Sequence, residues 1–151
     1  MKKLLFISAL ILMPLCVFSQ QSNHKNPLPL AKYEDNVKLP LTAIERAQII
    51  EAYGDSAEKL VFSKPNRLKS IKHILRNRVV IKLITNENEK KPCPKLSEMA
   101  EAVGLDYSQE EAFNPNNFNP LKYGLNFYSR SAAMYQVDDT NYYIIVKSQY
   151  Q

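Results

Sequence analysis

The pattern of apolar and polar positions is most regular near the C-terminus of the chain. Residues 142–147 read Tyr-Tyr-Ile-Ile-Val-Lys, a short aromatic and β-branched run without helical spacing. A polar stretch with turn chemistry, 138–141, precedes this run, and a second extended run lies at 133–137. Two extended runs around a polar turn predict a β-hairpin. Because 142–146 is apolar on both pleat faces, this strand is expected inside a sheet rather than at its edge.

Helical spacing dominates the part of the chain that follows Pro40. Thr42-Ala-Ile-Glu45 is a capping box, in which the Thr42 and Glu45 side chains each bond the other residue's backbone amide. It predicts a helix over 43–53 that ends at Gly54, since glycine adopts the left-handed conformation at least cost. A shorter helical piece follows, with its apolar residues at 60–62 turned inward.

A further helix is predicted to begin at Ser63-Lys-Pro65, because proline is tolerated in a first helical turn. Its apolar stripe consists of Leu68, Ile71 and Leu75 at helical spacing, and it is expected to close at residue 77 or 78.

Three segments complete the predicted fold. Residues 79–84 are β-branched and nearly continuous, which predicts a strand. Residues 96–105 fit a short helix better than a strand, and 121–128 alternate as a strand does. The predicted class is α+β, with two or three N-terminal helices packed on a mainly antiparallel sheet of about four strands that ends in the C-terminal β-hairpin.

The N-terminus has the order of regions found in a secretory signal peptide. Lys2 and Lys3 precede an apolar run over 4–18, after which the composition turns polar. We predict a signal peptide over 1–19 with cleavage near Ser19, a flexible leader over 20–39 and a single α+β domain over 40–151. The protein is thus expected to be exported, periplasmic or secreted. A retained anchor helix and lipid attachment at Cys16 are alternatives; Leu15 is large for the residue that precedes a lipidated cysteine.

Basic residues gather in the predicted third helical region. The chain carries a formal charge of +5, and no acidic residue lies between Glu58 and Glu87. Lys69, Lys72 and Arg76 share one helix face, with His73 beside them. The mutual repulsion of such a face would be relieved by a polyanion.

For an exported protein, the expected partners of this basic face are an acidic glycan, lipopolysaccharide or membrane head groups, and no nucleic acid. The alternative is a solvated helix face whose charges are balanced in the fold by acidic residues: Glu45, Glu51, Glu58 or Glu89.

Ten of the fifteen aromatic residues fall in the last third of the chain, among many asparagines. Such a region can form a platform on which sugar rings stack while amides bond hydroxyl groups. The candidate binding residues are Asn116, Asn117, Phe118 and Tyr128, because loops carry binding more often than strand interiors. The alternative is ordinary strand composition.

Cys93 is the one cysteine beyond the predicted signal, and it lies in Lys90-Lys-Pro-Cys-Pro-Lys95. The lysines would favour its thiolate, which makes Cys93 a reactive-thiol candidate, although a bland surface thiol also fits. His24, His73 and Cys93 lack zinc-site spacing, and no glycine-rich phosphate loop is present, so we predict no metal site and no cofactor.

These patterns favour a non-enzymatic binding or envelope-associated protein that contacts an acidic envelope component through the basic helix. No catalytic residue is assigned. The rival hypothesis is a small secreted hydrolase acting on glycan or peptidoglycan, with Asp106, Glu110 or Asp138 as the acid opposite an aromatic wall. A structural subunit of an envelope assembly is a third hypothesis, and it would expose a large apolar patch.

Overall fold

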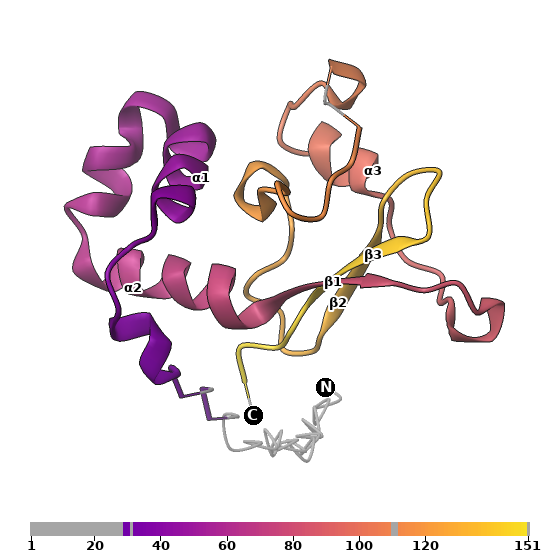
Figure 1. Ribbon diagram of the computed structural model, residues 1–151, viewed down its shortest axis with the longest axis horizontal. Helices are drawn as coiled ribbons and strands as arrows, with labels where there is room; N and C mark the ends of the chain where they lie inside the picture. Colours follow the sequence, from indigo (N-terminus) through magenta and orange to yellow (C-terminus); the bar gives the residue numbers. More distant parts are fainter. Residues whose placement is uncertain (1–28, 31, 110–111, 151) are drawn as a thin grey trace, which may run out of the picture.

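The computed structural model describes residues 29–30, 32–109 and 112–150. The predicted signal peptide and Cys16 lie outside these residues. Figure 1 shows a helical part and a sheet part, joined by one rod in which helix α2 (Pro65–His73) and turn η4 (Ile74–Arg78) lead directly into strand β1 (Val79–Leu83). Across the described residues, no helix is both long enough and apolar enough to span a bilayer.

Helix α1 (Ala43–Tyr53) begins at the predicted capping box. The Glu45 amide donates to Thr42 Oγ1 at 3.1 Å, and the Thr42 amide donates to Glu45 Oε2 at 2.8 Å. The helix ends at Gly54, whose φ of 52° lies in the left-handed region that favours glycine. The sequence therefore sets both ends of α1 locally, and the prediction for this helix is confirmed.

The helical part has its own hydrophobic core. Turns η2 (Gly54–Ser56) and η3 (Glu58–Phe62), the second of them π-helical, carry the chain from α1 to α2. Ile49, Ala57, Val61 and Ile71 are buried together where these elements meet. Pro65 occupies the first turn of α2, as predicted.

The sheet has three antiparallel strands in the order β1-β3-β2, where β2 is Ala133–Gln136 and β3 is Tyr142–Val146. The C-terminal hairpin is confirmed, and β3 is its central strand, with Ile144 opposite Ile81 on one side and Tyr135 on the other. Asp139 in the hairpin turn has a positive φ of 52°. The α+β class is thus confirmed, with three strands instead of about four.

The missing strand is the one predicted over 121–128, and that prediction is wrong. The segment instead contains turn η7 (Pro120–Lys122) and then a series of tight turns, in which Leu125 and Phe127 each donate to the carbonyl two residues back. Its alternation was real, because Tyr123 and Leu125 are buried. Alternation, however, indicates only which side chains are buried. A strand also needs a neighbouring strand with which its backbone forms hydrogen bonds.

The core of the sheet part lies between the sheet and helix α3 (Leu96–Glu101), the short helix predicted for that region. Gly124 packs closely on α3, where its amide donates to the Met99 carbonyl at 3.1 Å. An added Cβ at Gly124 would lie 3.0 Å from that same oxygen. The buried members of this core are Leu96, Ala100, Tyr123, Leu125, Tyr135, Val137, Ile144 and Val146.

Three further 3₁₀ turns complete the described structure: η1 (Asp35–Lys38), η5 (Glu87–Glu89) and η6 (Tyr107–Gln109). Turn η1 lies against α2. Val37 of this turn is only 2% exposed, so the end of the range predicted as a leader packs on the rod.

Candidate functional site

The C-terminal end of the rod formed by α2 and η4 gathers several of the predicted site residues. Four polar or charged residues there are at most 9% exposed: Lys72, His73, Asn77 and Arg78. Turn η4 is π-helical, a geometry that proteins use sparingly and often near functional sites. Buried polar side chains need partners, and those of the rod fall into two groups.

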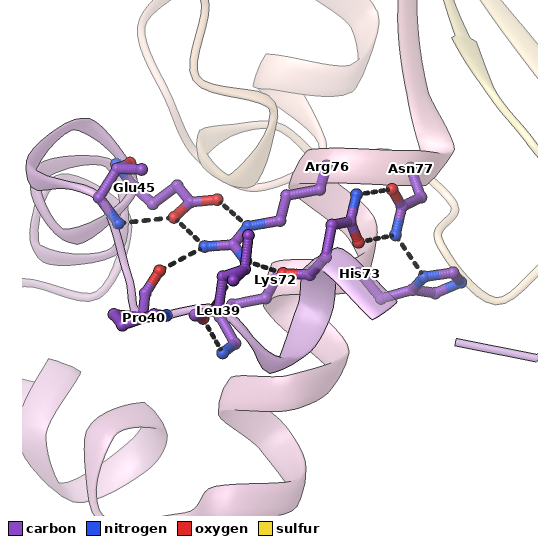
Figure 2. Close-up of polar contacts among 9 residues, drawn as sticks. Leu39, Pro40, Glu45, Lys72, His73, Arg76 and Asn77 are labelled. Carbon is purple, nitrogen blue, oxygen red and sulfur yellow. Dashed lines mark hydrogen bonds and ion pairs between the residues drawn. The ribbon is translucent and has the colours of Figure 1, made fainter. Parts of the chain in front are cut away.

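The first group centres on Arg76, whose guanidinium donates to both oxygens of Glu45, from Nε at 2.5 Å and from Nη2 at 2.6 Å. The same guanidinium donates to the backbone carbonyls of Asn36 and Pro40. The Arg76 and Glu45 side chains are only 12% and 10% exposed. We call Arg76, Glu45 and the bonded backbone of residues 36–42 the Arg76 network (Figure 2).

Both charges of this network are stabilised by their pairing. The hydrogen bond from Arg76 lowers the pKa of Glu45 and outweighs burial, which acts to raise it; the Thr42 amide and the Arg76 charge also act to lower it. The bond to Glu45 in turn raises the pKa of Arg76. Because Glu45 also caps α1, a single carboxylate ties α1, the segment before it and the rod together.

The predicted basic face is divided by these contacts. Lys72 Nζ donates to the Leu39 carbonyl at 2.7 Å, and Arg76 is committed to Glu45. Lys69 is exposed, and its ammonium lies 4.8 Å from the centre of the Tyr33 ring. Of the three cations predicted to share the face, Lys69 therefore remains at the surface. Arg76 forms an ion pair with Glu45, one of the acidic residues named in the alternative hypothesis of a solvated face.

The second group of buried polar side chains begins at His73 and Asn77. Asn77 Nδ2 donates to His73 Nδ1 at 3.0 Å, which leaves Nε2 as the N–H donor of the neutral ring (Figure 2). The two amide groups of Asn77 and Asn36 bond each other, at 2.6 and 3.0 Å. The ring of Tyr33 meets the His73 ring edge to face, with 4.7 Å between their centres.

Arg78 is the most buried cation of the rod, at 5% exposure. Its guanidinium donates to the Lys147 carbonyl from Nε at 3.1 Å and from Nη2 at 2.8 Å, and to the Phe127 carbonyl at 2.6 Å. Within the described part of the chain, no carboxylate forms an ion pair with it. Arg78 is therefore hydrogen-bonded, but no carboxylate of the described residues neutralises its charge.

A cavity of about 120 Å³ adjoins Arg78 and His73, and we call it the Arg78 niche. Tyr128, which is 73% exposed, lies at its rim. The structure thus brings together two predicted site residues, His73 and Tyr128, which are distant in sequence. The complete lining is Leu30, Tyr33, Ser70, His73, Ile74, Arg78, Tyr128 and Gln149.

Burial dominates the electrostatics of this niche. It lowers the pKa of Arg78, against the effect of Tyr128 and Tyr33, and it lowers the pKa of His73. The Arg78 charge lowers the pKa of His73 further, while the Glu34 carboxylate acts in the opposite direction. Burial thus disfavours the charged forms of both Arg78 and His73.

A larger cavity, of about 450 Å³, lies in the aromatic region between the end of α1, α3 and the loop before η7. Asn117 and Phe118 line it, whereas Asn116 is exposed on the adjacent turn and is not part of the lining. The four residues predicted for an aromatic site are therefore distributed over two cavities and a loop surface, because Tyr128 belongs to the Arg78 niche.

The acids named for a hydrolase do not converge on one described cleft. Asp138 accepts from the amide and hydroxyl of Ser97, at 2.9 and 2.6 Å, and so caps α3. Asp106 accepts from Ser108 next to it, and Glu110 lies outside the described residues.

Cys93 is partly buried in the loop between β1 and α3. Burial raises the pKa of its thiol, the Glu98 charge adds to this, and a backbone hydrogen bond with Gln136 opposes it. These surroundings favour the thiol over the thiolate at neutral pH, so they lend no support to a reactive Cys93.

No group of three His, Cys, Asp or Glu side chains able to hold a metal ion exists among the residues described. Comparisons with known protein families, with curated proteins and with solved structures find no match for this chain.

Sequence reasoning missed Arg78 as a site residue, although a signal for its burial was present. Leu68, Ile71 and Leu75 define the apolar stripe of the rod, and residue 78 is the next position on that stripe. An arginine at that position is expected to point inward. What it meets there, the carbonyls of Phe127 and Lys147, comes from segments far away in sequence.

Proposed function

We propose that the protein is a non-enzymatic, envelope-associated binding protein that holds an anionic group of its ligand, a carboxylate or a phosphate, in the Arg78 niche. The observation that carries this proposal is the buried guanidinium of Arg78, which borders a cavity and has no carboxylate partner among the described residues. The envelope location rests on the predicted signal peptide over 1–19.

The charge of Arg78 supplies the driving force. A buried, unpaired ion costs several kcal/mol in desolvation, and neutral carbonyls recover only part of this cost. An anion beside Arg78 would regain the rest, and charge-assisted hydrogen bonds to guanidinium groups are about twice as strong as neutral ones. The ligand would therefore supply the counter-charge that the described residues do not provide.

The size of the cavity selects the kind of ligand. A volume of about 120 Å³ accommodates one carboxylate or phosphate group but not a polymer, so most of the ligand would lie outside. The surface around the rim suits an amphiphilic or glycan chain, because Leu30 and Tyr128 are 65% and 73% exposed and Lys69 is nearby on α2. Lipid head groups and acidic glycans both carry groups of the required chemistry.

This mode of binding differs from the polyanion-coated helix face that the sequence suggested. A surface of several lysines binds through many weak contacts that salt screens strongly. One buried guanidinium binds a single group, and buried pairs are screened much less. Binding is thus expected to survive physiological salt and to depend on Arg78 far more than on Lys69.

The test is a titration of the mature protein with inorganic phosphate, followed through the NMR signals of the His73 ring. We expect a saturable shift in the wild type, no shift in Arg78→Met, and an unchanged affinity in the matched control Lys69→Met. Vesicles of phosphatidylglycerol against phosphatidylcholine, and glucuronate against glucose, then distinguish a head group from an acidic glycan.

A second variant covers the case in which Arg78→Met does not fold. Tyr128→Ala changes an exposed rim residue and should weaken phosphate binding without unfolding the protein. The proposal is overturned if the wild type shows no saturable response to any of the anions, or if Lys69→Met removes the response while Arg78→Met retains it.

A further inference from the structure

The larger cavity lies apart from the Arg78 niche and has a different chemistry, and its lining comes from segments distant in sequence. Glu51 is contributed by α1, Tyr107 by η6, Lys122 by η7, and Phe113 and Phe118 by the loop between them. Its volume of about 450 Å³ falls in the range of small-molecule sites. The further lining residues are Leu96, Ala112, Asn114, Asn117, Asn119 and Tyr123.

Aromatic rings in mutual contact form one wall of this cavity. Phe118 stacks on Tyr123 with 5.2 Å between ring centres and 20° between planes, and Phe113 contacts Phe118 at 5.4 Å. Phe113 also meets Tyr142 of β3 at 5.2 Å, which ties the wall to the central strand. Phe113 and Phe118 therefore add rings that are held by mutual contact to a lining that is otherwise mostly polar.

An ion pair, whose Glu51 side chain is half exposed, lies in the same lining. Lys122 Nζ lies 3.1 Å from Glu51 Oε1, and Asn119, which is only 4% exposed, donates to Glu51 Oε2 at 2.9 Å. Burial acts to raise the pKa of Glu51, but the bonds from Asn119 and Lys122 and the Lys122 charge outweigh it, so the pKa lies below its ordinary value. The carboxylate is therefore ionised at neutral pH and is held in one orientation.

We infer that this cavity is a second binding site and takes a neutral pyranose sugar. One face of a pyranose ring is lined by C–H groups and packs on aromatic surface, while its hydroxyls both donate and accept. An oriented carboxylate and the Asn117 amide, which has no hydrogen-bond partner among the described residues, match those hydroxyls. Asn117 was predicted from the sequence as a binding residue of this kind.

Two other ligand classes fit less well. A purely apolar ligand would remove water from the ion pair and the amides without replacing their hydrogen bonds, which is unfavourable. An anion would be repelled by the ionised Glu51.

Glycoside cleavage needs two carboxyl groups across the bond, one of them protonated. Glu51 is the one carboxylate among the described lining residues. The described lining therefore supports sugar binding and supplies no second carboxylate for hydrolysis.

The test is a titration with chitobiose and with methyl β-glucoside, followed by saturation-transfer NMR and by tyrosine fluorescence, since the chain has no tryptophan. Asn117→Ala and Glu51→Gln should each weaken binding of the better sugar about tenfold, as expected for the loss of a hydrogen bond to a charged or well-placed group. Asn116→Ala is the matched control, because Asn116 is exposed on the same turn without lining the cavity.

The outcomes separate this inference from the proposed function. Arg78→Met should leave sugar binding unchanged, and Asn117→Ala should leave phosphate binding unchanged. The inference is overturned if neither sugar binds the folded wild type, if Asn116→Ala weakens binding as much as Asn117→Ala, or if the sugar is cleaved during the titration.

Discussion

Two arginines that lie two positions apart on the same rod have opposite surroundings. Arg76 donates from Nε and Nη2 to the two carboxylate oxygens of Glu45, and this pairing raises the pKa of Arg76. Among the described residues, Arg78 bonds backbone carbonyls only, and burial lowers its pKa. Both are little exposed, so burial alone does not distinguish them. The Arg76 network thus pairs its charge within the fold, whereas no carboxylate of the described residues pairs with Arg78.

The largest effect is expected from breaking the Arg76 network. Glu45→Ala leaves Arg76 buried without its counter-charge and removes one of the two bonds of the capping box, so the free energy of unfolding should fall by about 3 kcal/mol in a urea titration. The matched control is Glu89→Ala, because its pair with Lys82 is 53% exposed on both sides and should cost no more than about 0.5 kcal/mol. Equal urea midpoints for the two variants would contradict the prediction.

A smaller loss is expected when the niche cation is removed. Arg78→Met loses three hydrogen bonds to carbonyls but also relieves an unneutralised buried charge, so its cost should be about 1–2 kcal/mol. Arg76→Met should cost more, because it leaves Glu45 buried and unpaired. Phosphate at ten times its dissociation constant should stabilise the wild type by about 1.4 kcal/mol and Arg78→Met not at all. If the two arginine variants lost the same stability, the contrast between the regions would disappear.

The smallest effect is a difference in pH dependence between the two regions. Folding lowers the pKa of His73 below its ordinary 6.5, so the unfolded chain takes up this proton first, and stability is lost as the pH falls from 6.5 through the folded pKa. Folding also lowers the pKa of Glu45 below its ordinary 4.5, so its contribution is lost only at more acidic pH.

Two variants assign these pH windows. His73→Gln should remove the upper window from a plot of unfolding free energy against pH, and Glu45→Gln should remove the lower one. Phosphate bound in the niche should raise the pKa of His73, which an NMR titration of the ring measures directly. A fall in the His73 pKa on adding phosphate would argue against an anion beside it.

The sequence by itself determined the elements whose signals are local. The capping box at Thr42 and Glu45 and the glycine at 54 set α1, because caps act within one turn. The composition of 142–146 and the turn before it set the C-terminal hairpin. The candidates His73, Asn117, Phe118 and Tyr128 line two cavities, but their role in binding stays a prediction.

Only the tertiary structure decided which partner each of these groups meets. Alternation over 121–128 identified buried side chains, but no neighbouring strand was available to make that segment a strand. Arg76 found Glu45 across 31 positions, while Arg78 found carbonyls 49 and 69 positions away. Periodicity reports which side of an element faces inward, whereas Coulomb and hydrogen-bond energies depend on distances that folding alone creates. The same run of basic residues therefore contains Arg76, which pairs with Glu45, and Arg78, which donates to the carbonyls of Phe127 and Lys147.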